Sequence, residues 1–168
     1  AGGDYAARVA VTADDELGRV AQAMNSMADA VAAREAELEG VAYTDRLTGL
    51  PNRAMLRRQV GEGRWASDGF AVILMDVARL RTVNEVLGFE TGDMLLVAVA
   101  RRLEAAVAAE PGASRRTALA RLPGGVFAVL CEGRGRAAME AMRERLDAQV
   151  AMALACDGHA VDVHLVFG

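Results

Sequence analysis

The sequence predicts an α/β fold, an α+β sandwich with a ferredoxin-like central sheet flanked by helices and preceded by a long N-terminal coiled-coil helix. Two observations favour this fold. A heptad repeat of apolar residues runs through the first part of the chain, which is typical of a coiled coil. After it the patterns follow the order strand, two helices, two-strand hairpin, helix and strand, which is typical of a sheet covered by helices. We therefore expect two domains, residues 1–42 and residues 43–168.

Residues 14–42 form one long helical pattern in which two apolar positions repeat every seven residues. Only Arg34 interrupts the apolar seam. A strict 3.5-residue period over this length favours a coiled coil that dimerises, and the alternative is an amphipathic helix docked on its own domain. Gly40 and the Thr44-Asp45 pair are expected to end or interrupt the helix, with Gly40 as a flexible joint. The seam residues expected to form the dimer coil are Leu17, Val20, Met24, Met27, Val31 and Leu38, followed by Val41.

The remainder of the chain alternates strand and helix patterns. The first strand, Phe70 to Asp76, is continuously apolar, so we expect it to be buried on both faces. Gly124-Gly125 lies between two apolar runs and predicts a tight hairpin turn, because glycine readily adopts positive φ. The expected helices are residues 52–60, 79–87, 92–109 and 136–154, and the expected strands are residues 70–76, 118–122, 126–130 and 160–167.

Composition narrows the classes of function. The chain has 168 residues, 53% of them hydrophobic and 25% charged, which suits a globular protein. A net charge of −4 and an aromatic content of 4% argue against nucleic-acid partners. The chain contains no run of 18 apolar residues, so the sequence predicts no membrane-spanning helix within it. Cys131 and Cys156 follow apolar stretches without a CxxC partner, so we expect buried reduced thiols and a cytosolic compartment rather than a zinc site.

Two short motifs at the start of the helical pattern resemble the second helix of a HAMP domain. They are Asp15-Glu16-Leu17-Gly18 and Met24-Asn25-Ser26-Met27. HAMP modules are parallel dimeric four-helix coils that pass signals from a membrane-spanning helix. The resemblance implies a homodimer through the coil, a membrane link through an upstream segment outside this chain, and a location on the cytoplasmic side of the inner membrane. A generic coiled coil is the alternative.

Residues 43–168 resemble a GGDEF domain, which has the nucleotide-cyclase-like fold of diguanylate cyclases. Several motifs in the right order carry this resemblance. Leu165-Val166-Phe167-Gly168 resembles a strand after which the family continues with another helix and strand, so we expect the C-terminal part of the domain to be missing. The motifs are Asp45-Arg-Leu-Thr-Gly-Leu-Pro-Asn-Arg53, then Asn84, Gly88, Gly92-Asp93, and the hairpin frame Arg121-Leu122 and Phe127-Ala128-Val129-Leu130.

The active family joins two GTP molecules into cyclic di-GMP with the help of divalent metal held by carboxylates. Asp76 matches a metal ligand of the family, although an acid at a strand end can also be a cap or a surface residue. Ala78 stands where a second Asp is common. The degenerate hairpin reads Pro123, Gly124, Gly125, Val126 and Phe127, with glycine and valine at the two acidic positions. One carboxylate cannot easily hold two metal ions, so we expect no cyclase activity and no catalytic residues.

The residues that match the family's guanine-binding pair are kept. Asn84 and Asp93 suit guanine because a carboxylate accepts from its N1 and N2 donors, although both residues could instead serve helix ends. Arg81 replaces a lysine and could contact phosphate, whereas Phe89 replaces a histidine. No cofactor is expected. Mg²⁺ and GTP are expected as ligands only if residual nucleotide binding survives.

The family's product-inhibition motif, Arg-x-x-Asp, falls on Ser114 and Thr117, so product binding is not expected despite the nearby Arg115 and Arg116. The sequence thus favours a catalytically inactive GGDEF domain in a membrane-linked bacterial cyclic di-GMP signalling protein. It would relay a HAMP signal to a partner or to a downstream domain such as an EAL domain. The alternatives are a divergent active diguanylate cyclase and a regulatory GTP-binding domain.

Overall fold

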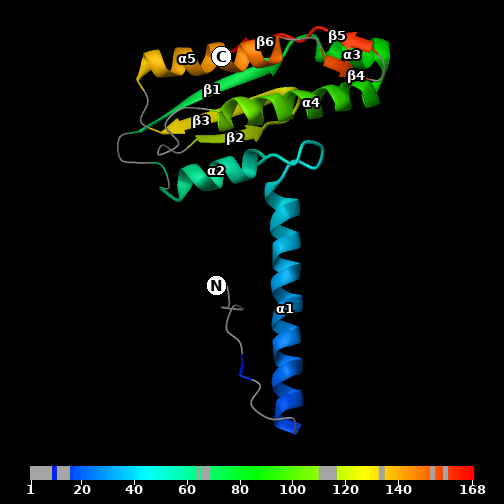
Figure 1. Ribbon diagram of the computed structural model, residues 1–168, viewed down its shortest axis with the longest axis vertical. Coiled ribbons are helices and arrows are strands. Elements are labelled where there is room, and N and C mark those ends of the chain that lie inside the picture. Colours follow the sequence, from blue (N-terminus) through cyan, green and yellow to red (C-terminus); the bar gives the residue numbers. More distant parts are fainter. Residues whose placement is uncertain are drawn as a thin grey trace. The chain divides into compact units, whose positions relative to one another are not determined.

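The computed structural model divides into two compact units, Ala1–Ala42 and Tyr43–Gly168. Helix α1 (Glu16–Tyr43) makes up most of the first unit (Figure 1). None of the helices in the described residues combines the length and hydrophobicity needed to cross a membrane. The residues that the structure describes are 9–10, 16–63, 65, 69–109, 117–132, 135–151, 154–156 and 159–168.

Helix α1 is one continuous helix of 28 residues. It runs through Gly40, so the expectation that Gly40 interrupts it is wrong: a single glycine in a helix costs only about 1 kcal/mol relative to alanine. Val31 is half-buried, whereas the other seam residues are exposed. Their exposed fractions range from 53 to 77%, and they are Leu17, Val20, Met24, Met27, Leu38 and Val41.

The second unit is built on a four-stranded antiparallel sheet with strand order β2-β3-β1-β6. β1 pairs with β3 along its length, from Phe70 opposite Glu132 to Asp76 opposite Val126. On its other side β1 pairs with β6, which places Val166 opposite Asp76. The strands are β1 (Phe70–Val77), β2 (Thr117–Arg121), β3 (Val126–Glu132) and β6 (Leu165–Phe167).

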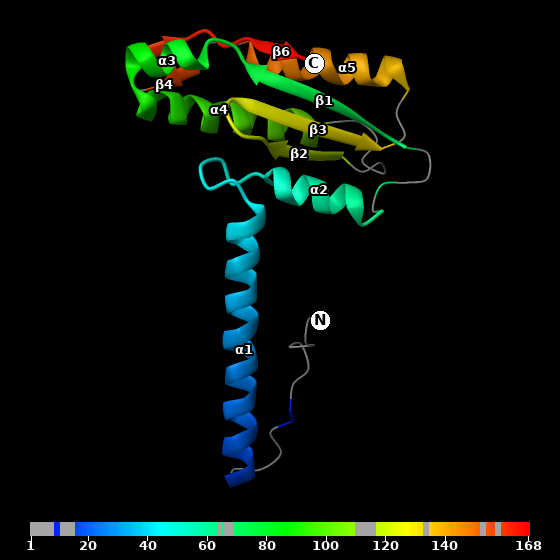
Figure 2. The ribbon, with the colours of Figure 1, turned by 180° about the vertical axis from the view of Figure 1, so that it is seen from behind.

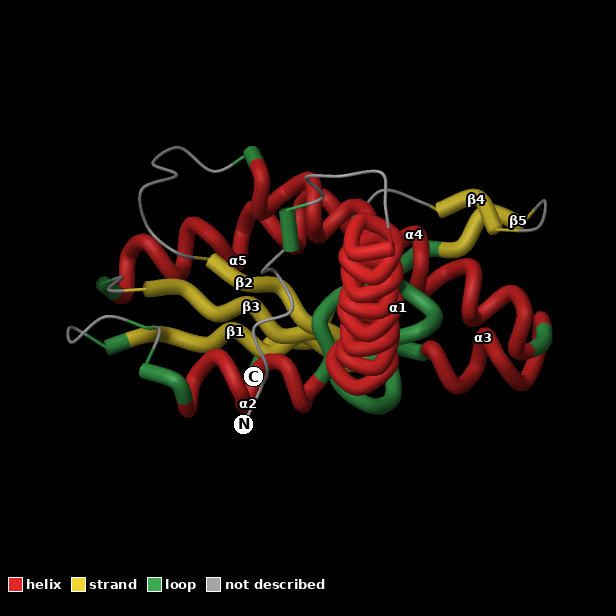
Figure 3. Tube along the Cα trace, turned by 90° about the horizontal axis from the view of Figure 1, so that it is seen from below, coloured by secondary structure: helices red, strands yellow, loops and turns green. Residues whose placement is uncertain are grey.

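Helices cover the two faces of this sheet in separate layers. Figures 2 and 3 show α4 and α5 on one face and α2 on the other. α3 precedes α4 and packs beside it. The helices are α2 (Arg53–Gly61), α3 (Leu80–Leu87), α4 (Phe89–Ala108) and α5 (Arg136–Val150).

The main core lies between the sheet and the layer of α4 and α5. As the helical periodicity predicts, α4 and α5 bury one apolar face each. Cys131 is a free, buried cysteine as expected, and burial raises the pKa of its thiol despite a hydrogen bond with Thr117. The side chain of Cys156 lies outside what the structure describes. The largest core side chains with almost no exposed surface are Phe127, Met75, Leu95, Leu103, Leu130, Met142 and Leu146.

The expectation that β1 is buried on both faces is wrong. Its residues alternate, with Ile73, Met75 and Val77 buried and Phe70, Val72 and Leu74 between 40 and 44% exposed. The reason is that α2 packs over β2 and β3 on this face. Ala128 and Leu130 of β3 are buried there together with Trp65 and the half-buried Leu56 of α2.

The predicted last strand, residues 160–167, is also wrong as a single element. β5 (His159–Val161) pairs instead with β4 (Leu154–Cys156) in a separate two-stranded sheet. The chain then bends before β6, where the carbonyl of His164 accepts a hydrogen bond from the amide of Ala78 at 2.9 Å. α5 ends at Val150 with Ala151 as its C-cap, earlier than the expected end at residue 154, and Leu154 belongs to β4 instead.

Candidate functional site

The segment after α1 forms a tight turn around Asp45. The amide and the hydroxyl of Thr48 both donate to Asp45 Oδ1, at 2.9 and 2.7 Å. The amide of Asp45 donates to the carbonyl of Leu50 at 2.8 Å, and Leu50 is buried in the main core. Gly49 has a φ of 76°, a conformation that glycine adopts without strain. The turn is therefore fixed by its own hydrogen bonds and anchored through Leu50.

An ion pair joins this turn to the base of the β2–β3 hairpin. Arg121 Nη1 donates to both carboxylate oxygens of Asp45, each at 2.8 Å. Arg121 Nη2 donates to the carbonyl of Gly124 at 3.1 Å, and its backbone amide donates to the carbonyl of Pro51 at 2.8 Å. The side chains of Arg121 and Asp45 are only 13 and 22% exposed.

This arrangement determines the ionisation of Asp45. Burial raises the pKa of its carboxyl, but the hydrogen bonds from Arg121 and Thr48 outweigh burial and hold the pKa below its usual value. The sequence placed Asp45 and Arg121 in two separate motifs, 76 positions apart, and did not predict that they meet. Their opposite charges were the one available signal.

The hairpin turns where the sequence predicts. The amide of Leu122 donates to the carbonyl of Val126 at 2.8 Å, and Gly124 has a φ of 82°. Pro123 is exposed, whereas Gly125 is buried. The carbonyl of Gly125 accepts a hydrogen bond from the amide of Val77 at 3.0 Å, so the hairpin tip is tied to the end of β1.

The space beside Gly125 is occupied by other side chains. A Cβ atom at this position would lie 2.8 Å from Leu80 Cδ2, 3.3 Å from Asp76 Oδ1 and 3.6 Å from Val77 Cβ. The structure therefore brings Asp76 and position 125 together, as the resemblance implies. It also places a methyl group of Leu80 where a larger residue at 125 would begin, which the sequence did not predict.

These residues do not fit the two-metal site that the resemblance implies. Asp76 is exposed at the end of β1, and its neighbours across the sheet are Val126 and Val166, which have hydrocarbon side chains. Divalent cations such as Mg²⁺ need several oxygen ligands. Among the described residues, no group of three or more His, Cys, Asp or Glu side chains is arranged to hold a metal ion.

The guanine-matching residues lie where α3 meets α4. The Asn84 side chain lies directly on Gly92, because a Cβ on Gly92 would overlap the Asn84 side-chain oxygen. Gly88, with a φ of 89°, separates the two helices, so α4 begins at Phe89 rather than at Gly92 as predicted. Asp93 is exposed on the first turns of α4. The sequence identified Asn84 and Gly92 separately but not their contact.

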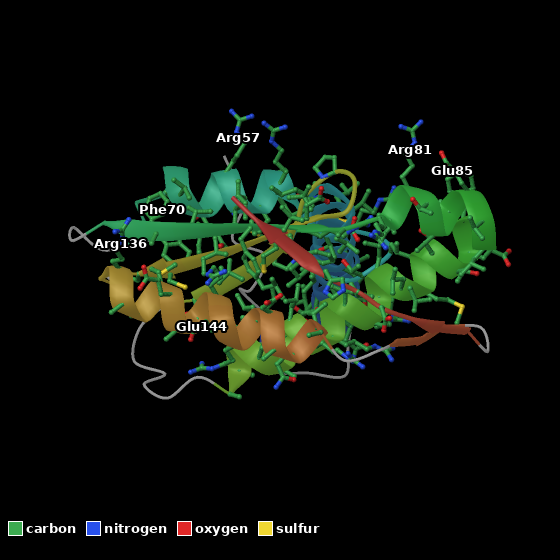
Figure 4. All side chains as sticks on the ribbon, turned by 90° about the horizontal axis from the view of Figure 1, so that it is seen from above. Arg57, Phe70, Arg81, Glu85, Arg136 and Glu144 are labelled. Carbon is green, nitrogen blue, oxygen red and sulfur yellow. The ribbon has the colours of Figure 1, made fainter. Side chains whose placement is uncertain are left out.

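Arg81 is exposed and pairs within its own helix. Its side chain is 92% exposed and its Nε donates to Glu85 Oε1 at 3.1 Å. Figure 4 shows both side chains projecting outward from α3. In the product-inhibition motif, Thr117 is the first residue of β2, whereas Ser114, Arg115 and Arg116 lie outside the described residues.

Comparison with known proteins assigns both parts of the chain. The family model "Diguanylate cyclase, GGDEF domain" matches residues 42–168, and the model "HAMP domain" matches residues 1–33. A curated relative, the bifunctional diguanylate cyclase/cyclic di-GMP phosphodiesterase MucR of Pseudomonas aeruginosa, is 31% identical over 146 residues. The match covers 84% of this chain and 20% of MucR, so the chain spans about a fifth of that relative.

Two solved structures share the fold. The coiled coil and GGDEF domain of DgcB from Caulobacter crescentus, in complex with c-di-GMP, matches with a TM-score of 0.72 and 20% identity, over 92% of this chain and 82% of that one. The S helix-GGDEF-EAL structure of Vibrio cholerae LapD, bound to c-di-GMP, matches with a TM-score of 0.62 and 22% identity, over 73% of this chain and 29% of that one.

Proposed function

The chain belongs to the GGDEF family of diguanylate cyclase domains, with a HAMP segment before the domain, and we propose that it is a non-catalytic member that relays a signal. The observation that carries this proposal is the hairpin tip, where Gly125 and Val126 occupy the two acidic positions of the family. Leu80 reaches to 2.8 Å from the place of a Cβ at position 125, so the missing carboxylate has no room without a shift of Leu80.

The chemistry of the family explains why this tip would be inactive. Attack of a 3′-hydroxyl on an α-phosphate develops negative charge that bound metal must neutralise. Asp76 is the carboxylate among the side chains that line position 125 in the described part of the chain, and one monodentate or bidentate acid leaves most of an Mg²⁺ coordination shell to water. Losing one preorganised charge-stabilising group typically raises a barrier by about 3 kcal/mol, and here at least two acidic groups are absent.

A relay role is supported by the contacts of the segment that follows α1. The carbonyl of Tyr43 accepts a hydrogen bond from the amide of Asn52 at 2.9 Å, and the Tyr43 ring lies 4.9 Å from the guanidinium of Arg58. Two residues later, Asp45 binds Arg121, which in turn binds the carbonyl of Gly124 in the hairpin turn. A displacement of the end of α1 would thus reach the hairpin through a short series of polar contacts.

Dimerisation through α1 would supply that displacement. The apolar seam of α1 is exposed in the single chain except at the half-buried Val31, and a heptad seam is stabilised by packing against a second helix. Introducing a charge at Met24 and Val31 together (Met24→Asp, Val31→Asp) should abolish the dimer, as measured by light scattering. An unchanged mass would contradict the coil. Ser26→Asp is the matched control, because Ser26 is exposed and lies outside the seam.

The whole protein is proposed to act in cyclic di-GMP signalling at the cytoplasmic side of the inner membrane, anchored by a segment upstream of this chain. MucR is named as both a cyclase and a phosphodiesterase, which supports a downstream EAL-type domain as the recipient of the signal. No nucleic acid is expected as a partner, in keeping with a net charge of −4.

A direct assay tests the absence of cyclase activity. The purified dimer is incubated with GTP and either Mg²⁺ or Mn²⁺, and cyclic di-GMP is measured by mass spectrometry beside an active diguanylate cyclase. We expect no product above the background without protein. Product formation that rises with protein concentration would overturn the proposal and support the divergent active cyclase.

Regulatory GTP binding is a second candidate, favoured by the seating of Asn84 on Gly92 next to the exposed Asp93. Calorimetric titration of the chain with GTP tests it, with Asn84→Ala and Asp93→Ala as variants that remove the base-edge partners. Heat that disappears in both variants would support this candidate. Absence of heat at high micromolar GTP would dismiss it and leave the relay proposal intact.

A further inference from the structure

Asn25 of α1 makes two hydrogen bonds with a single residue that precedes the helix. The amide of Val9 donates to Asn25 Oδ1 at 2.9 Å, and Asn25 Nδ2 donates to the carbonyl of Val9 at 3.0 Å. The two residues are sixteen positions apart. Asn25 belongs to the Met24-Asn25-Ser26-Met27 motif, and the proposed coil gives it no role because it lies outside the seam.

The two hydrogen bonds have the pattern of a hydrogen-bonded residue pair in an antiparallel β-sheet. A primary amide carries a carbonyl and an N–H₂ group at the spacing of a peptide group, so it can satisfy the donor and the acceptor of one residue together. Both contacts are to the Val9 backbone, and they therefore fix the position of the chain rather than recognise a particular side chain. A carboxylate at position 25 could accept from the Val9 amide but could not donate to its carbonyl.

Asn25 lies on a face of α1 that differs from the apolar seam. Gly18 and Ala21 share this face at helical spacing and are buried, with Ala21 only 6% exposed. The neighbouring seam residues Leu17 and Val20 are 77 and 56% exposed. The contact of Asn25 with Val9 therefore lies on a face other than the apolar seam, and the seam remains available to a second helix.

We propose that Asn25 is a latch that holds Val9 in one register on the face of α1 that Asn25 shares with Gly18 and Ala21. Val9 is 46% exposed, and two hydrogen bonds at an exposed site are weak enough to open and close at equilibrium. The latch thus provides a reversible connection between α1 and Val9, and this connection does not depend on the apolar seam. The inference is independent of whether the hairpin is catalytic.

Amide hydrogen exchange of Val9 in the full chain, followed by NMR, tests the latch. In the unmodified chain we expect protection of the Val9 amide, falling roughly tenfold in Asn25→Ala, which removes both hydrogen bonds. Asn25→Asp keeps an acceptor and should retain part of the protection. Ser26→Ala is the matched control and should leave the exchange of Val9 unchanged.

Two further measurements separate the latch from a general effect on α1. Alanine has a higher helix propensity than asparagine, so helix content by circular dichroism should not fall in Asn25→Ala. The mass from light scattering should also stay the same. Exchange of Val9 at the rate of an unstructured peptide in the unmodified chain, or equal protection in Asn25→Ala, would overturn the latch. A loss of dimer together with the protection would assign Asn25 to dimer packing instead.

Discussion

The base and the tip of the β2–β3 hairpin are held by opposite kinds of interaction. At the base, Arg121 connects Asp45, Pro51 and Gly124 through charged and backbone hydrogen bonds. At the tip, Gly125 has no side chain, and a methyl group of Leu80 occupies the adjacent space. The base fixes how the domain is folded, whereas the tip is where metal chemistry would take place. A cyclase scaffold can therefore be held together without any of its tip acids.

Replacing Arg121 with alanine tests the base and should have the largest effect. Arg121→Ala would leave the carboxylate of Asp45 largely buried and without its main partner, and would also release the carbonyl of Gly124. Breaking a largely buried ion pair on one side costs about 3 kcal/mol in free energy of unfolding. Urea denaturation measures this loss.

The matched control for this experiment is Arg57→Ala. Figure 4 shows Arg57 projecting from the outer side of α2, and its side chain is exposed. A substitution at such a position should change the free energy of unfolding by less than about 0.5 kcal/mol. If Arg121→Ala lowered the free energy of unfolding by less than about 1 kcal/mol, the Asp45–Arg121 pair would contribute no more than a surface ion pair. The base would then not be what holds the hairpin in place.

The pH dependence of the same contact gives a smaller effect. The pKa of Asp45 is lowered in the folded state, so its stabilising contribution is present above the unfolded pKa of about 3.9 and is lost as the pH falls through the folded pKa. Asp45→Asn removes that titration. The difference in free energy of unfolding between the two proteins should be constant from pH 7 to about pH 5 and should shrink below about pH 4.

Urea denaturation at a series of pH values measures this difference. The guanidinium of Arg121 does not titrate in this range, so a shrinking gap reports the Asp45 carboxyl. A gap that stays the same down to pH 3 would mean that Arg121 does not lower the pKa of Asp45 in solution. The ion pair would then be weaker than its 2.8 Å distances suggest.

The sequence predicted the elements whose signal is local. Heptad spacing identified α1, apolar periodicity identified α4 and α5, and paired glycines identified the hairpin turn between Leu122 and Val126. The position of Asp76 beside Gly125 also followed from motif order, because the resemblance places both at one site. These predictions needed only periodicity, turn chemistry and the order of motifs.

The features that the sequence did not predict depend on which helices and strands pack against each other in the folded domain. The continuous apolar run of β1 predicts a strand buried on both faces, yet Val72 is 44% exposed, and α2 packs on the neighbouring strands β2 and β3. The pairing of β5 with β4 competes with a continuous last strand, and a pattern of alternating residues fits both arrangements. Leu80 and Gly125 are 45 positions apart in the sequence, and neither residue type predicts that they lie next to each other.

A double-mutant cycle at Gly125 and Leu80 tests the tip and should give the smallest effect. Gly125→Ala adds a Cβ at 2.8 Å from Leu80 Cδ2, so Leu80 must shift, and we expect a loss of about 1 kcal/mol in the free energy of unfolding. Leu80→Ala removes the obstructing methyl groups and should cancel that loss in the double variant, which gives a coupling energy of about 1 kcal/mol. Urea denaturation of the four proteins measures it.

Gly61→Ala is the control for this cycle, because nothing lies within 4 Å of a Cβ at that position and alanine favours a helix. Additive effects of Gly125→Ala and Leu80→Ala would mean that Leu80 does not fill the space next to the turn. Coupling would mean that an acid at position 125 is accommodated only when Leu80 shifts, because the side chain of Leu80 occupies the space that its first atom needs. The absence of the acid and the presence of Leu80 would then be two parts of one packing arrangement.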